Sequence, residues 1–194
     1  PLIIKVASIP KERIQVYFID NDEYFKRKAT FTDEDGKLFP DNDERAIFFA
    51  KGVIETIKKL NWVPDIIHIH GWMASLLPLY LKEYYKKEAI FSETKIVTSV
   101  YNQPFTGTLN PELNKKVLFD KIAKKHIEPI KEPTYENLMQ IAINFSDGVI
   151  AGSKKTPKNL TNIIENSKKP FLPFASEKNR AEAYADFYKN ILSK

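Results

Sequence analysis

Cysteine is absent from the 194 residues, and histidine occurs only three times. The absence of cysteine excludes disulfide bonds, thiolate catalysis and zinc sites with cysteine ligands. No apolar run approaches the ~20 residues that cross a bilayer. The opening residues 1–13 lack the positive segment and the longer apolar stretch of a signal peptide. We therefore expect a cytoplasmic protein with no membrane partner.

Two glycine-rich phosphate-binding motifs are also missing. The chain contains neither the G-x-G-x-x-G fingerprint nor a Walker loop. In those motifs the glycines let backbone amides approach a phosphate closely. An unrelated nucleotide-binding Rossmann protein is therefore a weak alternative.

The charged residues indicate a lysine-rich, solvated surface. The net charge is +5 and the isoelectric point is about 9.1, but the lysines come as scattered pairs with aspartate and glutamate between them. Proteins that read nucleic acids instead cluster lysine and arginine on one face, with stacking aromatic residues. We predict no nucleic-acid partner, whereas a small anionic ligand stays compatible with the charge.

Strand and helix patterns alternate along the chain. Strands are predicted at 2–8, 13–20, 65–70, 95–101, 149–153 and 169–175, and helices at 43–60, 73–84, 134–145, 156–166 and 176–194. The central strands are continuous apolar runs, which is typical of strands buried on both faces of a parallel sheet. The predicted fold is α/β, with a doubly wound, mainly parallel Rossmann-like sheet.

Polar and turn residues mark the expected boundaries of these elements. Asn42 or Asp43 is expected to cap the first long helix, and Thr156 a later one, by accepting an amide hydrogen bond from the first turn. Pro78 should kink its helix or delay its start, because proline removes one backbone hydrogen bond. Residues 21–44 form a polar loop of a length that is often functional.

Two histidines lie where an apolar strand passes into a helix. The strand period of two places His68 and His70 on one face, and His70, Gly71 and Trp72 follow at the carboxyl end of the strand. Open α/β sheets bind ligands beyond that end, and a glycine there lets a ligand approach closely. His68 is expected to be a core histidine, His70 is a candidate cleft residue, and Trp72 is more often core than ligand platform.

A metal site is not expected. A His-x-His pair supplies two ligands, and the remaining histidine, His126, has no carboxylate placed with it by spacing. Protein metal sites need at least a third ligand. We predict no metal and no cofactor.

Several uncommon sequence pieces resemble, in the same order, the N-terminal catalytic domain of bacterial glycogen synthases and plant starch synthases. The pieces are RIQVYFIDNDEYFKRK, DNDERAIFFAKG, PDIIHIHGW and KIVTSVYNQPFTGTL. The family has a Tyr-Phe-rich strand ending in Asp-Asn, an Asp-Asn-x-x-Arg helix start, a Pro-Asp-x-x-His-x-His-Asp-Trp element, and a Thr-x-His-Asn strand end with a glycine following. The likeness is dense over residues 13–109.

This resemblance implies a fold, a reaction and partners. It implies the two-domain Rossmann-like glycosyltransferase fold (GT-B), of which this chain resembles the N-terminal half. Similar proteins transfer glucose from ADP-glucose to the non-reducing end of an α-1,4-glucan, with retention of configuration and without a metal. The implied partners are α-glucan and ADP-glucose, and the resemblance leaves the oligomeric state open.

Carried over residue by residue, the family's site is altered in this chain. His70 matches the second histidine of the His-x-His-Asp-Trp element and Trp72 its tryptophan, while Gly71 stands where the family has aspartate. Tyr101 replaces the family's histidine that lies against the transferred sugar, so no catalytic residue is assigned. The candidate substrate-binding residues are His70, Gly71, Trp72, Tyr101, Asn102 and Gly107.

We interpret residues 1–194 as a single Rossmann-like domain with a closing helix at 176–194. It is expected to be a fragment that lacks an upstream strand–helix–strand unit and the second, donor-binding domain. Transfer from a nucleotide sugar needs donors or cations aimed at the leaving phosphate, and two walls to position donor and acceptor. We therefore expect that this chain alone transfers no glucose.

A non-catalytic glucan-binding or regulatory module derived from the same family is the alternative function. The aromatic side chains of the two long predicted loops are Tyr24, Phe25, Phe31, Phe39 and Phe105. Such rings stack on sugars, but large apolar side chains more often pack inside a protein. Covering the sheet edge is therefore the favoured interpretation of these rings.

Overall fold

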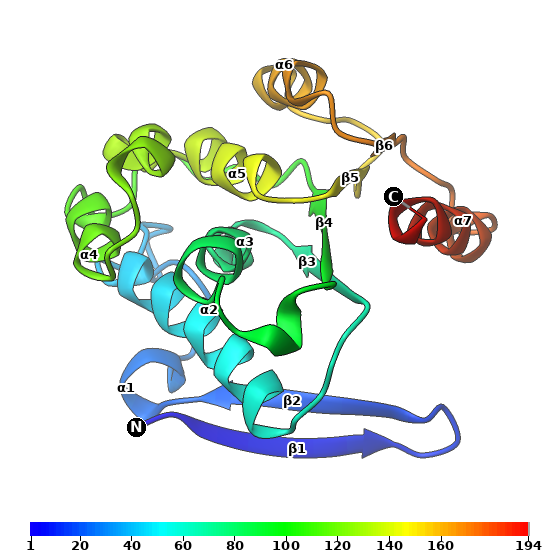
Figure 1. Ribbon diagram of the computed structural model, residues 1–194. Helices are drawn as coiled ribbons and strands as arrows, with labels where there is room; N and C mark the ends of the chain where they lie inside the picture. Colours follow the sequence, from blue (N-terminus) through cyan, green and yellow to red (C-terminus); the bar gives the residue numbers. More distant parts are fainter. Residues whose placement is uncertain (194) are drawn as a thin grey trace.

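A four-stranded parallel sheet with the order β3-β4-β5-β6 forms the centre of the molecule (Figure 1). The computed structural model describes residues 1–193. The strands are β3 (Ile66–His70), β4 (Lys95–Val100), β5 (Gly148–Ala151) and β6 (Phe171–Leu172). Each pairs in parallel with its neighbour, and β5 is buried over its whole length. The predicted α/β fold with a mainly parallel sheet is confirmed.

Helices cover the two faces of this sheet unequally (Figure 1). The larger core lies on the side of α2 (Asn42–Lys59), α3 (Leu77–Leu79), α5 (Tyr135–Asn144) and α6 (Lys158–Ser167). On the other side α7 (Arg180–Leu192) packs Phe187 and Ile191 against Val97 and Ile150. This α7 is the predicted last helix, of which residue 194 lies outside the described residues.

Short helical segments lie between these elements. Among them are α1 (Asp22–Phe25), α4 (Leu113–Phe119) and the 3-10 turns Ala89–Phe91, Lys124–His126 and Glu128–Lys131. Neither α1 nor α4 was expected from the sequence. Across residues 1–193, the structure contains no helix with the length and apolar character needed to span a bilayer.

The first two strands form an antiparallel hairpin outside the parallel sheet. β1 (Ile3–Ile9) pairs with β2 (Ile14–Asp20) over the full length of both strands. A parallel connection needs a dozen or more residues, and the turn between these strands is far shorter. The regular alternation of strand and helix is therefore wrong at the start of the chain. The hairpin rests on α2 at Gly52, where an added Cβ would lie 2.9 Å from Ile19 Cγ2.

The segment after β3 is a series of short turns. A 3-10 turn at Trp72–Ala74 is followed by α3, which has Pro78 in its first turn, and then by a π-helical turn at Tyr80–Tyr84. The predicted late start of this helix at Pro78 is confirmed. Trp72 thus begins the turn that follows β3.

Two predicted helix caps are wrong. The N-cap of α2 is Asp41, because Asn42 and Asp43 lie inside the helix. Their side chains are used elsewhere: the Asn42 amide donates to a carbonyl of the preceding loop, and the Asp43 carboxylate accepts from a lysine of α4. The N-cap of α6 is Pro157, whose ψ of 134° is not helical. Thr156 precedes this N-cap and therefore lies outside the helix.

Candidate functional site

A cavity of about 820 Å³ opens beyond the carboxyl ends of β3 and β4. Three segments line it: the long loop before α2, the turn after β3 and the loop after β4. The lining residues are Phe31, Thr32, Gly36, Leu38, His70, Gly71, Trp72, Met73, Tyr101, Gln103, Pro104, Phe105 and Thr106. Open α/β sheets bind ligands at this edge.

His70 and Tyr101 face each other at this cavity. His70 Nδ1 lies 2.7 Å from the Tyr101 hydroxyl oxygen. Surrounding protein atoms lower the pKa of His70 below its ordinary value, although part of its ring is open to solvent. Burial likewise raises the pKa of Tyr101. At neutral pH the pair is thus an uncharged imidazole hydrogen-bonded to a phenol.

His68 extends this row of polar rings into the sheet. Its ring centroid lies 4.1 Å from that of His70. His68 Nδ1 is 2.6 Å from the Tyr188 hydroxyl of α7, and Nε2 is 2.8 Å from Ser99 Oγ. Burial, together with the neighbouring His70, lowers the pKa of His68 to about 4. Both ring nitrogens of this neutral side chain have partners, as predicted, but His68 is half-buried and so is not a fully buried core residue.

Gly71 and Trp72 shape the cavity through the backbone and through packing. Gly71 has φ 73° and ψ 173°, a combination open essentially to glycine alone. An aspartate with these torsions would be strained. Trp72 is buried, with its ring centroid 4.8 Å from that of Phe31 and 5.1 Å from that of Phe105. Trp72 is therefore a packed part of the cavity wall.

Two candidate residues lie apart from this group. Asn102 is exposed, and its backbone N–H donates to Ser153 Oγ over 3.0 Å. Gly107 has φ 82° and lines an adjoining cavity of about 660 Å³ that shares the tip of the long loop. The structure thus brings together four of the six candidates, namely His70, Gly71, Trp72 and Tyr101.

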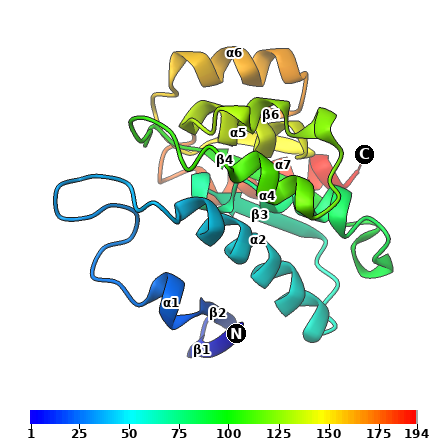
Figure 2. The ribbon, with the colours of Figure 1, turned by 90° about the vertical axis from the view of Figure 1, so that its left-hand side faces the viewer.

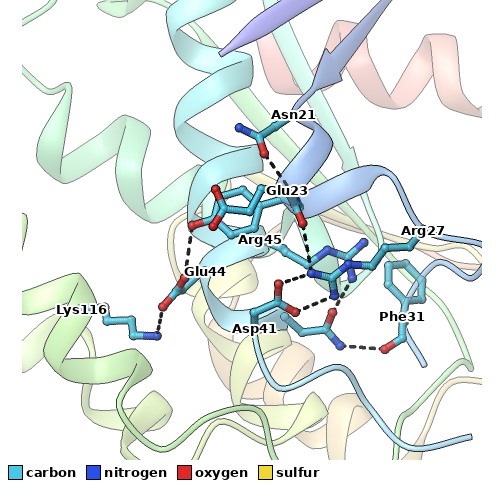
Figure 3. Close-up of polar contacts among 10 residues, drawn as sticks. Asn21, Glu23, Arg27, Phe31, Asp41, Glu44, Arg45 and Lys116 are labelled. Atoms are coloured by element: carbon cyan, nitrogen blue, oxygen red, sulfur yellow. Dashed lines mark hydrogen bonds and ion pairs between the residues drawn. The ribbon is translucent and has the colours of Figure 1, made fainter. Parts of the chain in front are cut away.

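A polar network that sequence reasoning did not anticipate fastens the loop wall (Figure 3). Arg27 donates from both terminal nitrogens to the Asp41 carboxylate, one of them over 2.8 Å, and this guanidinium lowers the pKa of Asp41. The Asn42 amide donates to the Phe31 carbonyl over 2.8 Å. Buried Arg45 donates to Asn42 Oδ1. The Asp-Asn-x-x-Arg motif at residues 41–45 was the sequence signal that could have predicted this fastening of the loop.

The same network ties α2 to α1 and α4 (Figure 3). Lys116 of α4 lies 2.8 Å from Asp43 Oδ2 and 2.5 Å from Glu44 Oε1. The Tyr24 hydroxyl donates to the other oxygen of Glu44 over 3.2 Å. The start of α2 is therefore tied to α1, which precedes the cavity loop, and to α4.

Most of the loop aromatics serve packing. Tyr24 and Phe25 lie with ring centroids 5.2 and 6.0 Å from that of a phenylalanine of α2. Phe39 lies beneath the guanidinium of the loop arginine, 4.8 Å away. Only Phe31 and Phe105 line the cavity, where both also pack against its tryptophan. Tyr24, Phe25 and Phe39 therefore serve packing, as expected, but the rings and cation that they contact belong to α2 and the loop arginine and not to the sheet edge.

The cavity lining offers hydrogen-bonding groups and aromatic faces but no fixed positive charge. Thr32, Gln103 and Thr106 add two hydroxyls and an amide to the His70–Tyr101 pair, and none of the described lining residues is lysine or arginine. Within residues 1–193, no three histidine, aspartate or glutamate side chains are grouped to hold a metal. Such a lining suits a neutral polyhydroxylated ligand better than a phosphate.

Comparison with known proteins extends over most of the chain. Residues 2–165 match the family described as the starch synthase catalytic domain. The glycogen synthase of Chlorobium limicola is 43% identical over 63% of this chain and 25% of its own length. That of Chlorobaculum tepidum is 34% identical over 99% of this chain and 38% of its own length. The chain thus spans about a quarter to two-fifths of these relatives.

A solved structure shares the fold. It is the catalytic domain of Starch Synthase IV from Arabidopsis thaliana bound to ADP and acarbose, with a TM-score of 0.67 and 16% sequence identity. The match covers 89% of this chain and 36% of the other. The parallel sheet and its covering helices are therefore the GT-B type of arrangement.

Proposed function

This chain belongs to the starch synthase catalytic domain family, and from that premise we propose that it forms one wall of a glucosyl-transfer site. The bound ligand of this wall is an α-1,4-glucan, held in the cavity at the carboxyl ends of β3 and β4. His70 and Tyr101 contact the sugar, and Trp72 supports the wall from behind. The donor in the complete reaction is ADP-glucose.

The lining chemistry is the observation that carries the proposal. A glucan presents hydroxyl groups, which the imidazole, phenol, amide and threonine hydroxyls of the cavity match. The related plant structure holds acarbose, an oligosaccharide mimic, together with ADP. Gly107 and Asn102 belong to the neighbouring rim, where a longer glucan continues beyond the first sugars.

The same lining argues against transfer by this chain alone. A departing ADP needs cations or amide dipoles directed at its phosphates, and the described lining of the cavity has no lysine or arginine. The family's histidine at the sugar is the phenol of Tyr101, which is already engaged with His70. We propose that a second Rossmann wall, outside residues 1–194, supplies the donor site.

The proposal extends to organisation and location. Residues 1–194 act as a single Rossmann-like domain, the N-terminal half of a GT-B pair, with α7 as its closing helix. The cytoplasm, expected from the sequence, is where this half meets its substrate. Cell fractionation with an antibody to the chain tests the location.

Two assays on the purified chain test the function. Calorimetric titration with maltoheptaose is expected to give saturable binding that His70→Ala weakens by about tenfold, since a bound hydrogen-bonding group is lost. Incubation with radiolabelled ADP-glucose and maltoheptaose is expected to give no longer glucan. Absence of any saturable binding would contradict the glucan site, and extension of the glucan would contradict the need for a second wall.

A further inference from the structure

Gly152, which follows β5, lies against the ring of Tyr101. A Cβ added to Gly152 would lie 2.5 Å from Tyr101 Cε1, 2.7 Å from Cζ and 2.9 Å from Cδ1. Non-bonded carbon atoms prefer separations of about 3.5–4.0 Å. The ring of Tyr101 occupies its observed place only because residue 152 has no side chain.

Space, and not backbone conformation, is what requires a glycine here. The glycines with positive φ are Gly36, Gly71 and Gly107, and Gly152 is not among them. The backbone N–H of Gly152 donates to the Val100 carbonyl over 2.8 Å, which continues the pairing of β4 and β5. Alanine is therefore compatible with the backbone at 152, and the conflict is confined to the Tyr101 ring.

The ring can give way only by leaving His70. The backbone of Tyr101 is held because its carbonyl accepts a hydrogen bond from the Tyr135 hydroxyl. Relief of a contact with Cε1 and Cζ thus requires rotation of the ring about its side-chain torsions. Such a rotation carries the hydroxyl, which lies beyond Cζ, away from His70 Nδ1, now 2.7 Å distant.

The Tyr101 hydroxyl also decides which nitrogen of His70 is free. A neutral imidazole has one bare nitrogen that accepts and one N–H that donates. The phenol is the stronger donor of the pair, so its proton goes to Nδ1 and the ring proton resides on Nε2. His70 Nε2–H is then left to donate to an oxygen of a ligand.

The geometry points to Gly152 as a positioning residue: by making room for the Tyr101 ring it holds the hydroxyl on His70 Nδ1 and presents Nε2–H to the ligand. The inference rests on the proposed glucan site. It also explains how a tyrosine is accommodated where the family has histidine. Tyr101 and Gly152 form a matched pair, in which the absent side chain of one residue leaves space for the larger ring of the other.

The test is a pH titration of the full chain in which NMR signals of the His70 imidazole report its protonation. Gly152→Ala is expected to move the titration midpoint of His70 upward, toward its ordinary value near 6.5, because the displaced hydroxyl no longer stabilises the neutral ring. Tyr101→Phe, which keeps the ring and removes the hydroxyl, is expected to move it in the same direction. An unchanged midpoint in Gly152→Ala would overturn the inference.

The double variants separate positioning from packing. In the Tyr101→Phe background, Gly152→Ala should leave the His70 midpoint nearly unchanged, because no hydroxyl remains to be displaced. In the Tyr101→Ala background it should leave Tm nearly unchanged, because no ring remains to clash. The comparison of Tyr101→Ala with the Tyr101→Ala, Gly152→Ala double variant keeps the inference testable if Gly152→Ala alone fails to fold. A Tm loss of equal size with and without the ring would overturn the steric pairing.

Acarbose binding distinguishes this inference from the proposed function. If the unmodified chain binds acarbose, Gly152→Ala is expected to weaken the affinity by about fivefold, the effect of one hydrogen bond. Unweakened binding by Gly152→Ala would overturn the role of residue 152 in ligand contact. If the unmodified chain binds neither acarbose nor maltoheptaose while the His70 midpoint still depends on Gly152, the glucan site fails and the Gly152–Tyr101–His70 coupling stands.

Discussion

At the scale of single residues, the carboxyl edge of β3 and β4 concentrates uncharged hydrogen-bonding groups. His70 pairs with Tyr101, and His68 pairs with Tyr188 and Ser99. Burial lowers the pKa values of both histidines, so neither carries charge at neutral pH. An edge of this kind can orient sugar hydroxyls, which need directed partners rather than net charge.

The backbone at Gly71 gives the first prediction. Gly71→Ala is expected to lower the free energy of unfolding by about 1–3 kcal/mol, because φ 73° with ψ 173° disfavours any side chain. No atom lies within 4 Å of the added Cβ, so the loss comes from backbone strain alone. Urea unfolding measures it. Gly71→Asp, which restores the family's residue, should be destabilised at least as much, and wild-type stability of either variant would contradict this account.

Stability should also depend on pH through His68. Its pKa is lowered from 6.5 to about 4 in the folded chain. Between these values the unfolded chain binds a proton that the folded chain does not, so stability is full above about 6.5 and falls as the pH drops toward 4. His70 acts in the same direction.

Urea unfolding between pH 5 and 7 measures this dependence. The window lies above the ordinary pKa values of Asp41 and Glu44, whose lowered values would otherwise add to the loss. His68→Gln, which keeps an amide donor and acceptor, should flatten the curve. An equal slope in this variant would show that another group causes it.

Residue spacing predicted the position of His70 but not its partners. The period of two in a strand places His68 and His70 on one face, and the end of that strand places His70 at the sheet edge. The contact between Tyr101 and Gly152 joins the ends of two different strands. No local pattern encodes such a contact, because it depends on the register of β4 against β5.

At the scale of elements, α7 and the long loop decide how the site is held. α7 covers its face of the sheet with a small apolar cluster and adds one polar contact, from Tyr188 to His68. The loop between α1 and α2 projects as a wide arc, which Figure 2 shows, and is fastened by the Arg27–Asp41 pair. The loop thus forms one wall of the cavity, whereas α7 supports the sheet and the His68 ring from the other face.

Tyr188→Phe tests the contact between α7 and the histidine row. Loss of the hydroxyl removes a partner of His68 Nδ1 and is expected to lower the free energy of unfolding by about 1 kcal/mol. Tyr184→Phe is the matched control. Its hydroxyl makes no hydrogen bond within residues 1–193, so a change below about 0.5 kcal/mol is expected. Equal losses in the two variants, measured by urea unfolding, would contradict a specific role for Tyr188.

Arg27→Ala tests the fastening of the loop. Removal of the two guanidinium contacts should free the loop, so that limited trypsin digestion cuts faster at Lys28 and Lys37. Lys26→Ala is the control, because the Lys26–Asp22 pair is exposed and such pairs contribute little. Faster cleavage in Lys26→Ala, or unchanged cleavage in Arg27→Ala, would contradict the assigned role.

The presence of strands and helices was easier to predict from the sequence than the way in which they pair and pack. Apolar runs and helical spacing located the four strands of the parallel sheet and the principal helices. They did not show that β1 and β2 form a separate hairpin, because pairing depends on the short turn between them. The caps of α2 differed from expectation because Asn42 and Asp43 bond to the loop and to α4, segments that local rules do not see.

At the scale of the whole molecule, the candidate ligand cavity lies at the carboxyl edge of a four-stranded parallel sheet that helices cover on both faces. The chain spans 25–38% of the length of the glycogen synthases described above. A further cavity lies at the far end of the hairpin beside Trp62, which is 55% exposed. The two tryptophans of the chain thus mark two separate surfaces, with Trp72 at the proposed glucan site.

This arrangement allows the central claim to be tested by one NMR titration. In the nitrogen–proton spectrum of the full chain, maltoheptaose is expected to shift the indole signal of Trp72 in a saturable way while the Trp62 signal stays in place; Trp62→Phe assigns the two signals. A Trp72 signal that does not move at saturating sugar, or a shift of Trp62 in its place, would contradict a glucan site at the carboxyl ends of β3 and β4.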